Sequence, residues 1–205
     1  MSSAPLSRIV LASVSPRRYE LLRSLGLEVE VAASGYDEAP VPQLTPAELA
    51  SYHALEKLRA ALRLRTELDV PMLAADTVVD LDGAALGKPR DPAEARRMLS
   101  SLSGREHLVH TAFALALPGG TPLEERATTR VRFYRLDPEE IATYVAGGEP
   151  LDKAGAYGIQ GLAASLVEAI DGDFYTVMGL PLGRFVRTLR RLGFALPTPN
   201  QARLA

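Results

Sequence analysis

The stretch LASVSPRRYELL (residues 11–22) passes from an apolar strand directly into an amphipathic helix. Ser15 is a good N-cap, Pro16 suits the first helical position, and Gly26 suits the far end of the helix. The free N–H groups at such a helix start, with the two arginines that follow Pro16, favour an anion such as phosphate. Ordinary capping with two solvated arginines accounts for the same residues, so the stretch alone leaves both interpretations open.

Three further helix starts follow one pattern, in which an N-cap residue precedes proline and a glutamate lies two residues after the proline. These starts are Thr45, Asp91 and Asp137, and a last helix is predicted over residues 182–192. Strands are predicted over residues 8–12, 27–33, 72–81, 107–117, 127–136, 164–170 and 174–178. Hairpin turns are predicted at residues 82–83, 119–120 and 171–173.

This order of elements predicts an α/β fold. Alternation of strand and helix at the start predicts parallel pairing, whereas the tight turns require antiparallel neighbours, so we expect a mixed β-sheet with flanking helices. No shift in composition marks a boundary, and we expect one domain over residues 1–205 with a frayed tail at 197–205. Two lobes, with residues 91–144 as an insertion-like half, are the alternative.

Composition excludes several classes of function. The formal net charge of -2 argues against a general binder of nucleic acid or of membrane surfaces, which usually carry a basic excess. The absence of cysteine excludes disulfides, zinc–thiolate sites and thiol nucleophiles. Neither a signal peptide nor a membrane span is evident, and we expect a cytoplasmic protein.

Polar residues interrupt the apolar strand LAADTVVDLDG (residues 73–83) at Asp76 and Thr77. A carboxylate at such a position is costly to bury unless it is paired, hydrogen-bonded or bound to a metal. Asp76 is therefore a candidate general base or metal ligand, with an exposed strand face as the alternative. Asp37 and Glu38 end the preceding strand, where acids flank a metal or simply belong to a loop.

Basic residues lie near the ends of elements in the same part of the chain. Lys57 belongs to the helix that starts at Thr45, and Lys88 and Arg90 precede the helix that starts at Asp91. Single lysines are usually solvated. Together with the acids, however, they match what metal-assisted phosphoryl transfer needs, namely carboxylates for a cation and water, and positive charge for phosphate oxygens.

The segment EPLDKAGAYGIQG (residues 149–161) combines glycines and charges with one amide in an apolar setting. Its glycines permit tight turns and close approach of a ligand. The amide of Gln160 presents a donor and an acceptor side by side, as the edge of a nucleobase does. A tight structural loop is the alternative.

Five segments, in order, resemble the signatures of the Maf family of nucleoside triphosphate pyrophosphatases. These are LASVSPRRYELL, LAADTVVDLDG with LGKPRD, LSGREH, DKAGAYGIQG and DGDFYTVMGLPL, and the match runs from Ile9 to about Leu192. The resemblance implies a cytoplasmic, homodimeric enzyme, dependent on Mg²⁺ or Mn²⁺, that hydrolyses a nucleoside triphosphate to the monophosphate and pyrophosphate. It also implies a mixed α/β fold with a deep cleft, like that of inosine-triphosphate pyrophosphatases.

Residue by residue, the resemblance makes Asp76 the proton acceptor and, with Glu38, a metal ligand. Residues that would line the triphosphate are Ser13, Arg17, Arg18, Lys57 and Lys88. The branch of the family that prefers dTTP and UTP carries an arginine, a threonine and a glutamine where this chain has Arg17, Thr77 and Gln160. Whether Asp37 or Glu38 reaches the metal stays open.

The chemistry of the bases agrees with that branch. Uracil and thymine present acceptor, donor and acceptor, and a glutamine amide accepts from N3–H while it donates to O4. Modified pyrimidine triphosphates with the same edge are further candidate substrates. Two alternatives remain: a pyrophosphatase for 7-methyl-GTP, and a nucleotide-binding regulator of cell division that needs no turnover. For His53, His107 and His110 we expect hydrogen-bonded structural roles.

Overall fold

The computed structural model describes residues 4–39, 41–65 and 67–197. Its strands are β1 (Ala4–Pro5), β2 (Arg8–Leu11), β3 (Glu28–Val31), β4 (Met72–Leu81), β5 (Ala84–Leu86), β6 (Glu106–Ala116), β7 (Leu123–Phe133), β8 (Val167–Asp171) and β9 (Phe194–Ala195). Its helices are α1 (Pro16–Ser24), α2 (Pro46–Arg63), α3 (Pro92–Leu102), α4 (Pro138–Ala146), α5 (Phe174–Met178) and α6 (Leu182–Arg191). Three 3₁₀ segments are η1 (Glu149–Asp152), η2 (Ala154–Ala156) and η3 (Gly161–Leu166). All of the predicted tail except Pro197 lies outside the described residues.

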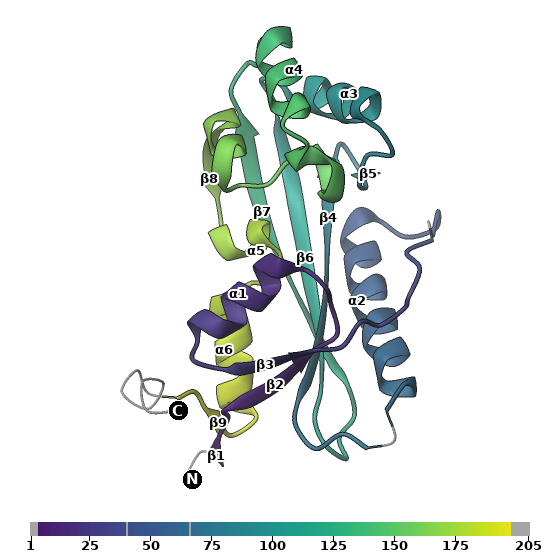
Figure 1. Ribbon diagram of the computed structural model, residues 1–205, viewed down its shortest axis with the longest axis vertical. Helices are drawn as coiled ribbons and strands as arrows, with labels where there is room; N and C mark the ends of the chain where they lie inside the picture. The colour runs from purple at the N-terminus through teal and green to yellow at the C-terminus, as the bar shows by residue number, and fades with distance from the viewer. Residues whose placement is uncertain (1–3, 40, 66, 198–205) are drawn as a thin grey trace.

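The main sheet is mixed, as predicted. Its strand order is β3-β2-β4-β6-β7-β8, with β5 also paired to β4, and β1 and β9 form a separate small sheet. Strand β2 runs parallel to β3 and β4, whereas β4, β6, β7 and β8 pair in antiparallel fashion. Figure 1 shows β4, β6 and β7 running through most of the length of the molecule, with α3 and α4 at one end and α2 and α6 toward the other.

The four predicted N-caps are confirmed by hydrogen bonds. The side chains of Ser15, Thr45, Asp91 and Asp137 each accept a backbone N–H from the first turn of α1, α2, α3 and α4. Gly26, with φ of 81°, follows the end of α1. The helix starts are therefore determined by short local sequences.

One predicted strand is wrong. Residues 174–178 form the helix α5, although Phe, Tyr, Thr and Val favour strands. The Asp173 carboxylate accepts the N–H of Thr176 at 2.8 Å, and Gly179, with φ of 112°, ends the helix. The cap at each end outweighs the strand preference of the residues between them. The turn predicted at residues 171–173 consequently leads into a helix rather than a hairpin, while those at 82–83 and 119–120 join antiparallel strands. The strand predicted over 164–170 is shorter, since η3 occupies its first half.

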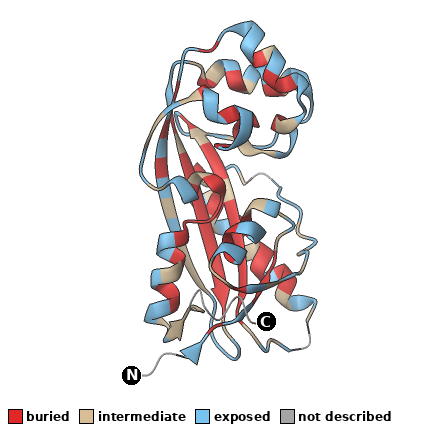
Figure 2. Ribbon diagram, turned by 60° about the vertical axis from the view of Figure 1, so that its left-hand side comes forward, coloured by how far each residue is buried: buried red, intermediate tan, exposed pale blue. Residues whose placement is uncertain are grey.

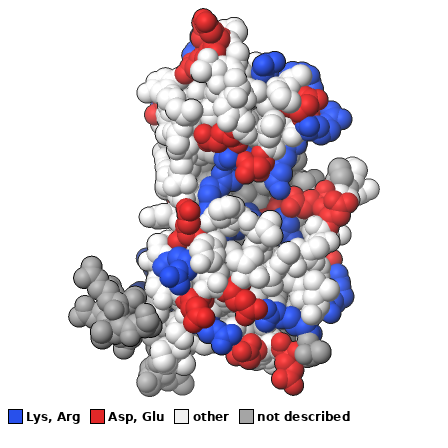
Figure 3. Space-filling view, viewed as in Figure 1, with Lys and Arg blue, Asp and Glu red and all other residues white. Residues whose placement is uncertain are grey.

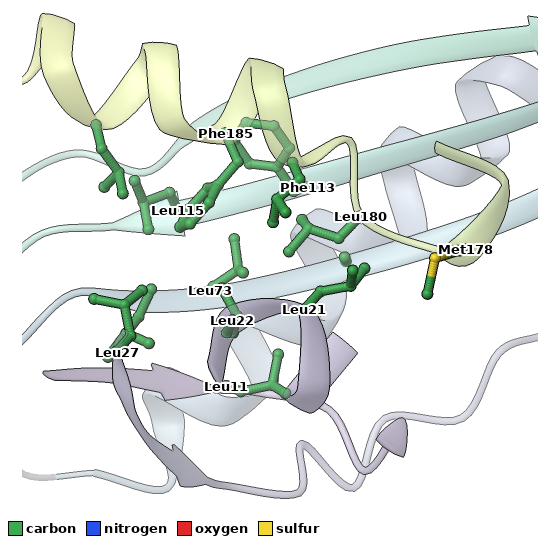
Figure 4. Close-up of a cluster of buried hydrophobic side chains, with 14 of the residues drawn as sticks. Leu11, Leu21, Leu22, Leu27, Leu73, Phe113, Leu115, Met178, Leu180 and Phe185 are labelled. Atoms are coloured by element: carbon green, nitrogen blue, oxygen red, sulfur yellow. The ribbon is translucent and has the colours of Figure 1, made fainter. Parts of the chain in front are cut away.

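Both faces of the central strands are covered, and side chains alternate between them. On one face, Leu73 and Phe113 pack against α1 and α6, as Figure 4 shows. On the other face, Met72 and Ala112 pack against Ala54 and other small residues of α2. A third cluster joins β6 and β7 to α3 and α4. The buried residues in Figure 2 accordingly follow the central strands and the inner sides of the helices.

The pairing of β2 with β4 is short, so part of this edge of β4 has no partner strand among the described residues. It ends where the N–H of Ala12 donates to the carbonyl of Leu73, and β5 pairs with β4 only from Val79. Residues 74–78 of β4 therefore face a gap on that side among the described strands. The segments that leave β2 and β3 pass this gap, and binding sites commonly form at such carboxyl ends. Among the helices of the described ranges, none combines the length and apolar character that a membrane crossing requires.

Candidate active site

A cleft of about 1330 Å³ lies along the open edge of β4. All nine residues to which the sequence assigned a role line it: Ser13, Arg17, Arg18, Glu38, Lys57, Asp76, Thr77, Lys88 and Gln160. Asp37 and Arg90 also line it. Figure 3 shows basic side chains gathered in the hollow at mid-height of the molecule, with acidic side chains around it. The tertiary structure thus gathers the predicted residues in one place, although their roles stay predictions.

The neighbouring polar residues Asp76 and Thr77 of β4 reach opposite faces of the sheet. Asp76 continues the series of Met72 and Ala74, which face α2, whereas Thr77 continues that of Leu73 and Ala75, which face α1. Both line the cleft because the edge of the strand is open between them. A ligand in the cleft would therefore lie across the edge of β4, with the carboxylate of Asp76 on one side and the hydroxyl of Thr77 on the other.

On the α2 side, one ammonium joins two carboxylates. Lys57 Nζ lies 2.5 Å from Asp76 Oδ1 and 2.6 Å from Glu38 Oε1. Asp76 is 5% exposed and Lys57 9%, whereas Glu38 is more open to the cleft. Burial raises the pKa of Glu38, but the charge and hydrogen bond of Lys57 outweigh it, so that the pKa lies below its ordinary value of 4.5. Lys57 thus favours the ionised form of Glu38.

On the α1 side, Arg18 is a buried cross-link. Its guanidinium donates to the Gly179 carbonyl at 2.8 Å, to Thr77 Oγ1 at 3.1 Å and to Ser13 Oγ at 3.4 Å. Burial lowers the pKa of Arg18, and the carboxylate of Asp76 opposes that shift. These bonds tie α1 to β4 and to the end of α5, a role that the sequence did not indicate.

Arg17 reaches the opposite wall of the cleft. A Cβ added to Gly158 would lie 3.0 Å from Arg17 Nη1 and 2.9 Å from Lys153 Cε, so both side chains lie against this glycine. Lys153 Nζ donates to the carbonyl of Glu149 at 2.7 Å and pairs with Asp152 at 2.6 Å. Sequence reasoning missed Lys153, although it belongs to a quoted motif, because a single lysine in a loop carries no signal of its own.

The histidines are hydrogen-bonded, as predicted. His53 Nδ1 lies 3.0 Å from the hydroxyl of Tyr36, and His110 contacts Thr128 and Asp80. His107 Nε2 lies 2.7 Å from the hydroxyl of Tyr157, and burial lowers the pKa of His107 to about 4. His107 therefore stays neutral near pH 7. It holds the loop that carries Gly158 and Gln160 against β6.

Comparison with known proteins gives a consistent result. A family model described as Maf-like protein matches residues 8–192. A Thermus thermophilus protein named dTTP/UTP pyrophosphatase is 52% identical over 186 residues, covering 91% of this chain and 95% of that protein. A Symbiobacterium thermophilum protein of the same name is 48% identical over 194 residues, covering 94% and 98%.

Among solved structures, a HAM1 protein from Coxiella burnetii aligns with a TM-score of 0.49 and 19% identity, covering 91% of this chain and 100% of that chain. The family match covers the five motifs. It also covers every residue described above on the α1 and α2 sides of the cleft. The chain belongs to the Maf family.

Proposed function

We propose that this protein hydrolyses the bond between the α and β phosphates of dTTP and UTP, producing the nucleoside monophosphate and pyrophosphate. The observation that carries the proposal is the cleft itself, in which Asp76, Lys57 and Glu38 meet on one side and Thr77 and Gln160 lie along the same hollow. The names of the curated relatives support this substrate pair.

The chemical step requires a water oriented toward the α phosphorus. Asp76 accepts a proton from this water as the oxygen bonds to phosphorus. The bond from phosphorus to the bridging oxygen breaks, and the bridging oxygen leaves with the electron pair as part of pyrophosphate. Lys57, Lys88 and Arg17 place positive charge where the leaving group becomes more negative. The reaction needs no covalent intermediate on the protein.

The carboxylates of Asp76 and Glu38 suit a divalent cation such as Mg²⁺ or Mn²⁺. Among the described residues there is no cluster of three or more His, Cys, Asp or Glu that would bind a metal without help. Mg²⁺ is usually bound by one or two carboxylates together with substrate phosphates, and both carboxylates here meet at one ammonium. Asp76 and Glu38 would hold the cation, which would polarise phosphate oxygens and lower the pKa of bound water.

Recognition of the base is assigned to the other side of the cleft. Gln160 would donate from its amide to O4 of uracil or thymine, and Arg17 and Thr77 line the same cleft. Modified pyrimidine triphosphates that keep this edge are included in the proposal. From the resemblance to its family, we also propose that the protein is a cytoplasmic homodimer. Light scattering of the purified protein tests the oligomeric state.

The test is pyrophosphate release across a panel of nucleoside triphosphates, with Mg²⁺, with Mn²⁺ and with a chelator. Asp76→Asn is expected to lower kcat about 10²–10⁴-fold, since it removes a general base, while the fold is retained. Asp80→Asn is the matched control, because Asp80 lies on the same strand but contacts His110 outside the cleft. An Asp76→Asn variant as active as the Asp80→Asn control would contradict the mechanism.

Gln160→Ala separates base recognition from chemistry. We expect it to lower the preference for UTP over CTP about ten- to a hundredfold, because one hydrogen bond to the base is lost. The same panel of nucleotides measures this ratio. A preference equal to that of the parent protein would remove Gln160 from base recognition.

A further inference from the structure

A chain of hydrogen bonds runs beside the cleft, from Arg18 through the hydroxyls of Thr77 and Thr111 to α5. Arg18 Nη2 lies 3.1 Å from Thr77 Oγ1, which lies 2.9 Å from Thr111 Oγ1 on β6. Thr111 Oγ1 lies 2.6 Å from the carbonyl oxygen of Thr176 in α5. Thr111 and Thr176 are fully buried, whereas Thr77 is partly exposed and lines the cleft.

The direction of each hydrogen bond in this chain is determined by its two ends. A carbonyl oxygen only accepts, so the single hydroxyl proton of Thr111 is donated to Thr176. Thr111 can then only accept from Thr77, which uses the single hydroxyl proton of Thr77. At the other end, a guanidinium only donates, so Thr77 also accepts from Arg18. Thr77 retains one lone pair and no proton for a ligand.

We propose that Thr111 makes Thr77 an obligate acceptor, so that the cleft selects a base with an N–H donor at this position over a base with a ring-nitrogen acceptor. This inference rests on the proposed function and extends it to the discrimination of uracil and thymine from cytosine. Thr111 is a positioning residue, because it acts on the base only through Thr77. It lies outside the motifs that identified the family.

The placement of Thr77 separates it from Asp76, the residue assigned to the attacking water. Its side chain is on the α1 face of β4, opposite Asp76 and Lys57, and an acceptor without a proton repels phosphate oxygens. A Cβ added to Gly179 would lie 3.5 Å from Thr77 Oγ1, so this glycine lies directly against the hydroxyl. N3–H of uracil or thymine is a donor that suits this acceptor, whereas N3 of cytosine is itself an acceptor.

The variant Thr111→Val tests the inference. It removes the acceptor for the Thr77 hydroxyl, which is then free to rotate and to donate to cytosine. We expect the ratio of kcat/KM for UTP to that for CTP to fall about ten- to a hundredfold relative to the parent protein. Thr111→Ser keeps the hydroxyl and should keep the ratio.

A matched control is available in the same sheet. Thr129 on β7 is also buried, and its hydroxyl donates to the carbonyl of Asp173, the N-cap of α5, at 2.9 Å. Thr129→Val therefore removes the same kind of contact without touching Thr77. A fall in the ratio for Thr111→Val, with the parent ratio in Thr129→Val and Thr111→Ser, supports the inference. An unchanged ratio in Thr111→Val, or an equal fall in Thr129→Val, overturns it.

If Thr111→Val does not fold, a second variant tests the acceptor role of Thr77, on which the inference depends. Thr77→Val removes both the attraction for N3–H and the repulsion of cytosine N3, so kcat/KM should fall for UTP but not for CTP. Equal losses for both nucleotides would overturn the inference. Affinities of the Asp76→Asn protein for UTP and CTP, measured by calorimetry, test the same selectivity without turnover. A parent protein that releases no pyrophosphate contradicts the proposed function, whereas a parent that prefers UTP, with a Thr111→Val protein that keeps this preference, contradicts this inference alone.

Discussion

Replacement of Lys57 by methionine should destabilise the protein through Asp76. The ammonium of Lys57 is 2.5 Å from a carboxylate that is 5% exposed, and methionine fills much of the same volume without the charge. Removal of one partner of a buried ion pair leaves the other charge uncompensated, which costs about 3–5 kcal/mol. We expect a loss of about 3 kcal/mol in the free energy of unfolding at pH 7, the lower end of this range, because Asp76 lines a cleft.

The pH dependence of this loss has a defined sign. Lys57 holds the pKa of Glu38 below its ordinary value of 4.5, so the contribution of this pair is present above that value and disappears as the pH falls through the lower folded value. The difference between the parent and the Lys57→Met protein should therefore shrink in acid. Urea unfolding followed by circular dichroism at pH 7 and at acid pH measures it.

Two further variants serve as controls. Lys88→Met removes a cation from the same cleft, but Lys88 is exposed and takes part in none of the ion pairs of the described residues, so about 0.5 kcal/mol or less is expected. Asp76→Asn added to Lys57→Met removes the stranded charge and should restore about 2 kcal/mol or more. Equal stability of Lys57→Met and Lys88→Met, or no recovery in the double variant, would refute the reasoning.

Two more predictions concern the opposite wall of the cleft and His107, which supports it through Tyr157. Gly158→Ala should raise KM for UTP about tenfold, because the added Cβ displaces Arg17 and Lys153, and should cost less than about 1 kcal/mol of stability, since flexible ends of side chains move. Steady-state kinetics and urea unfolding measure both, and an unchanged KM would argue against a role of Arg17 in binding. Burial lowers the pKa of His107 from 6.5 to about 4, so its contribution to stability is complete above pH 6.5 and falls by about 3 kcal/mol toward pH 4. His107→Gln should lose correspondingly less stability over this range, and parallel pH profiles would contradict the assignment.

The helix starts and the strand β4 are the features that the sequence predicted best. Caps act over three or four residues, so Ser15, Thr45, Asp91 and Asp137 could be identified without tertiary information. The apolar run of β4 is equally local, and so is the anomaly of Asp76 within it. At α5 the same local reasoning was wrong, because the strand preference of Phe174 to Met178 is weaker than the caps at its two ends.

The sequence by itself determined the class of fold, the polar interruption of β4 and, through five ordered motifs, the family to which the residues belong. The tertiary structure alone decided that Lys57 joins Asp76 to Glu38, and that Arg18, Thr77 and Thr111 form one directed chain of hydrogen bonds. The physical reason is distance along the chain. Caps and strand patterns depend on neighbours in sequence, whereas charges and hydroxyls from α1, α2, β4 and β6 acquire partners only when the sheet assembles.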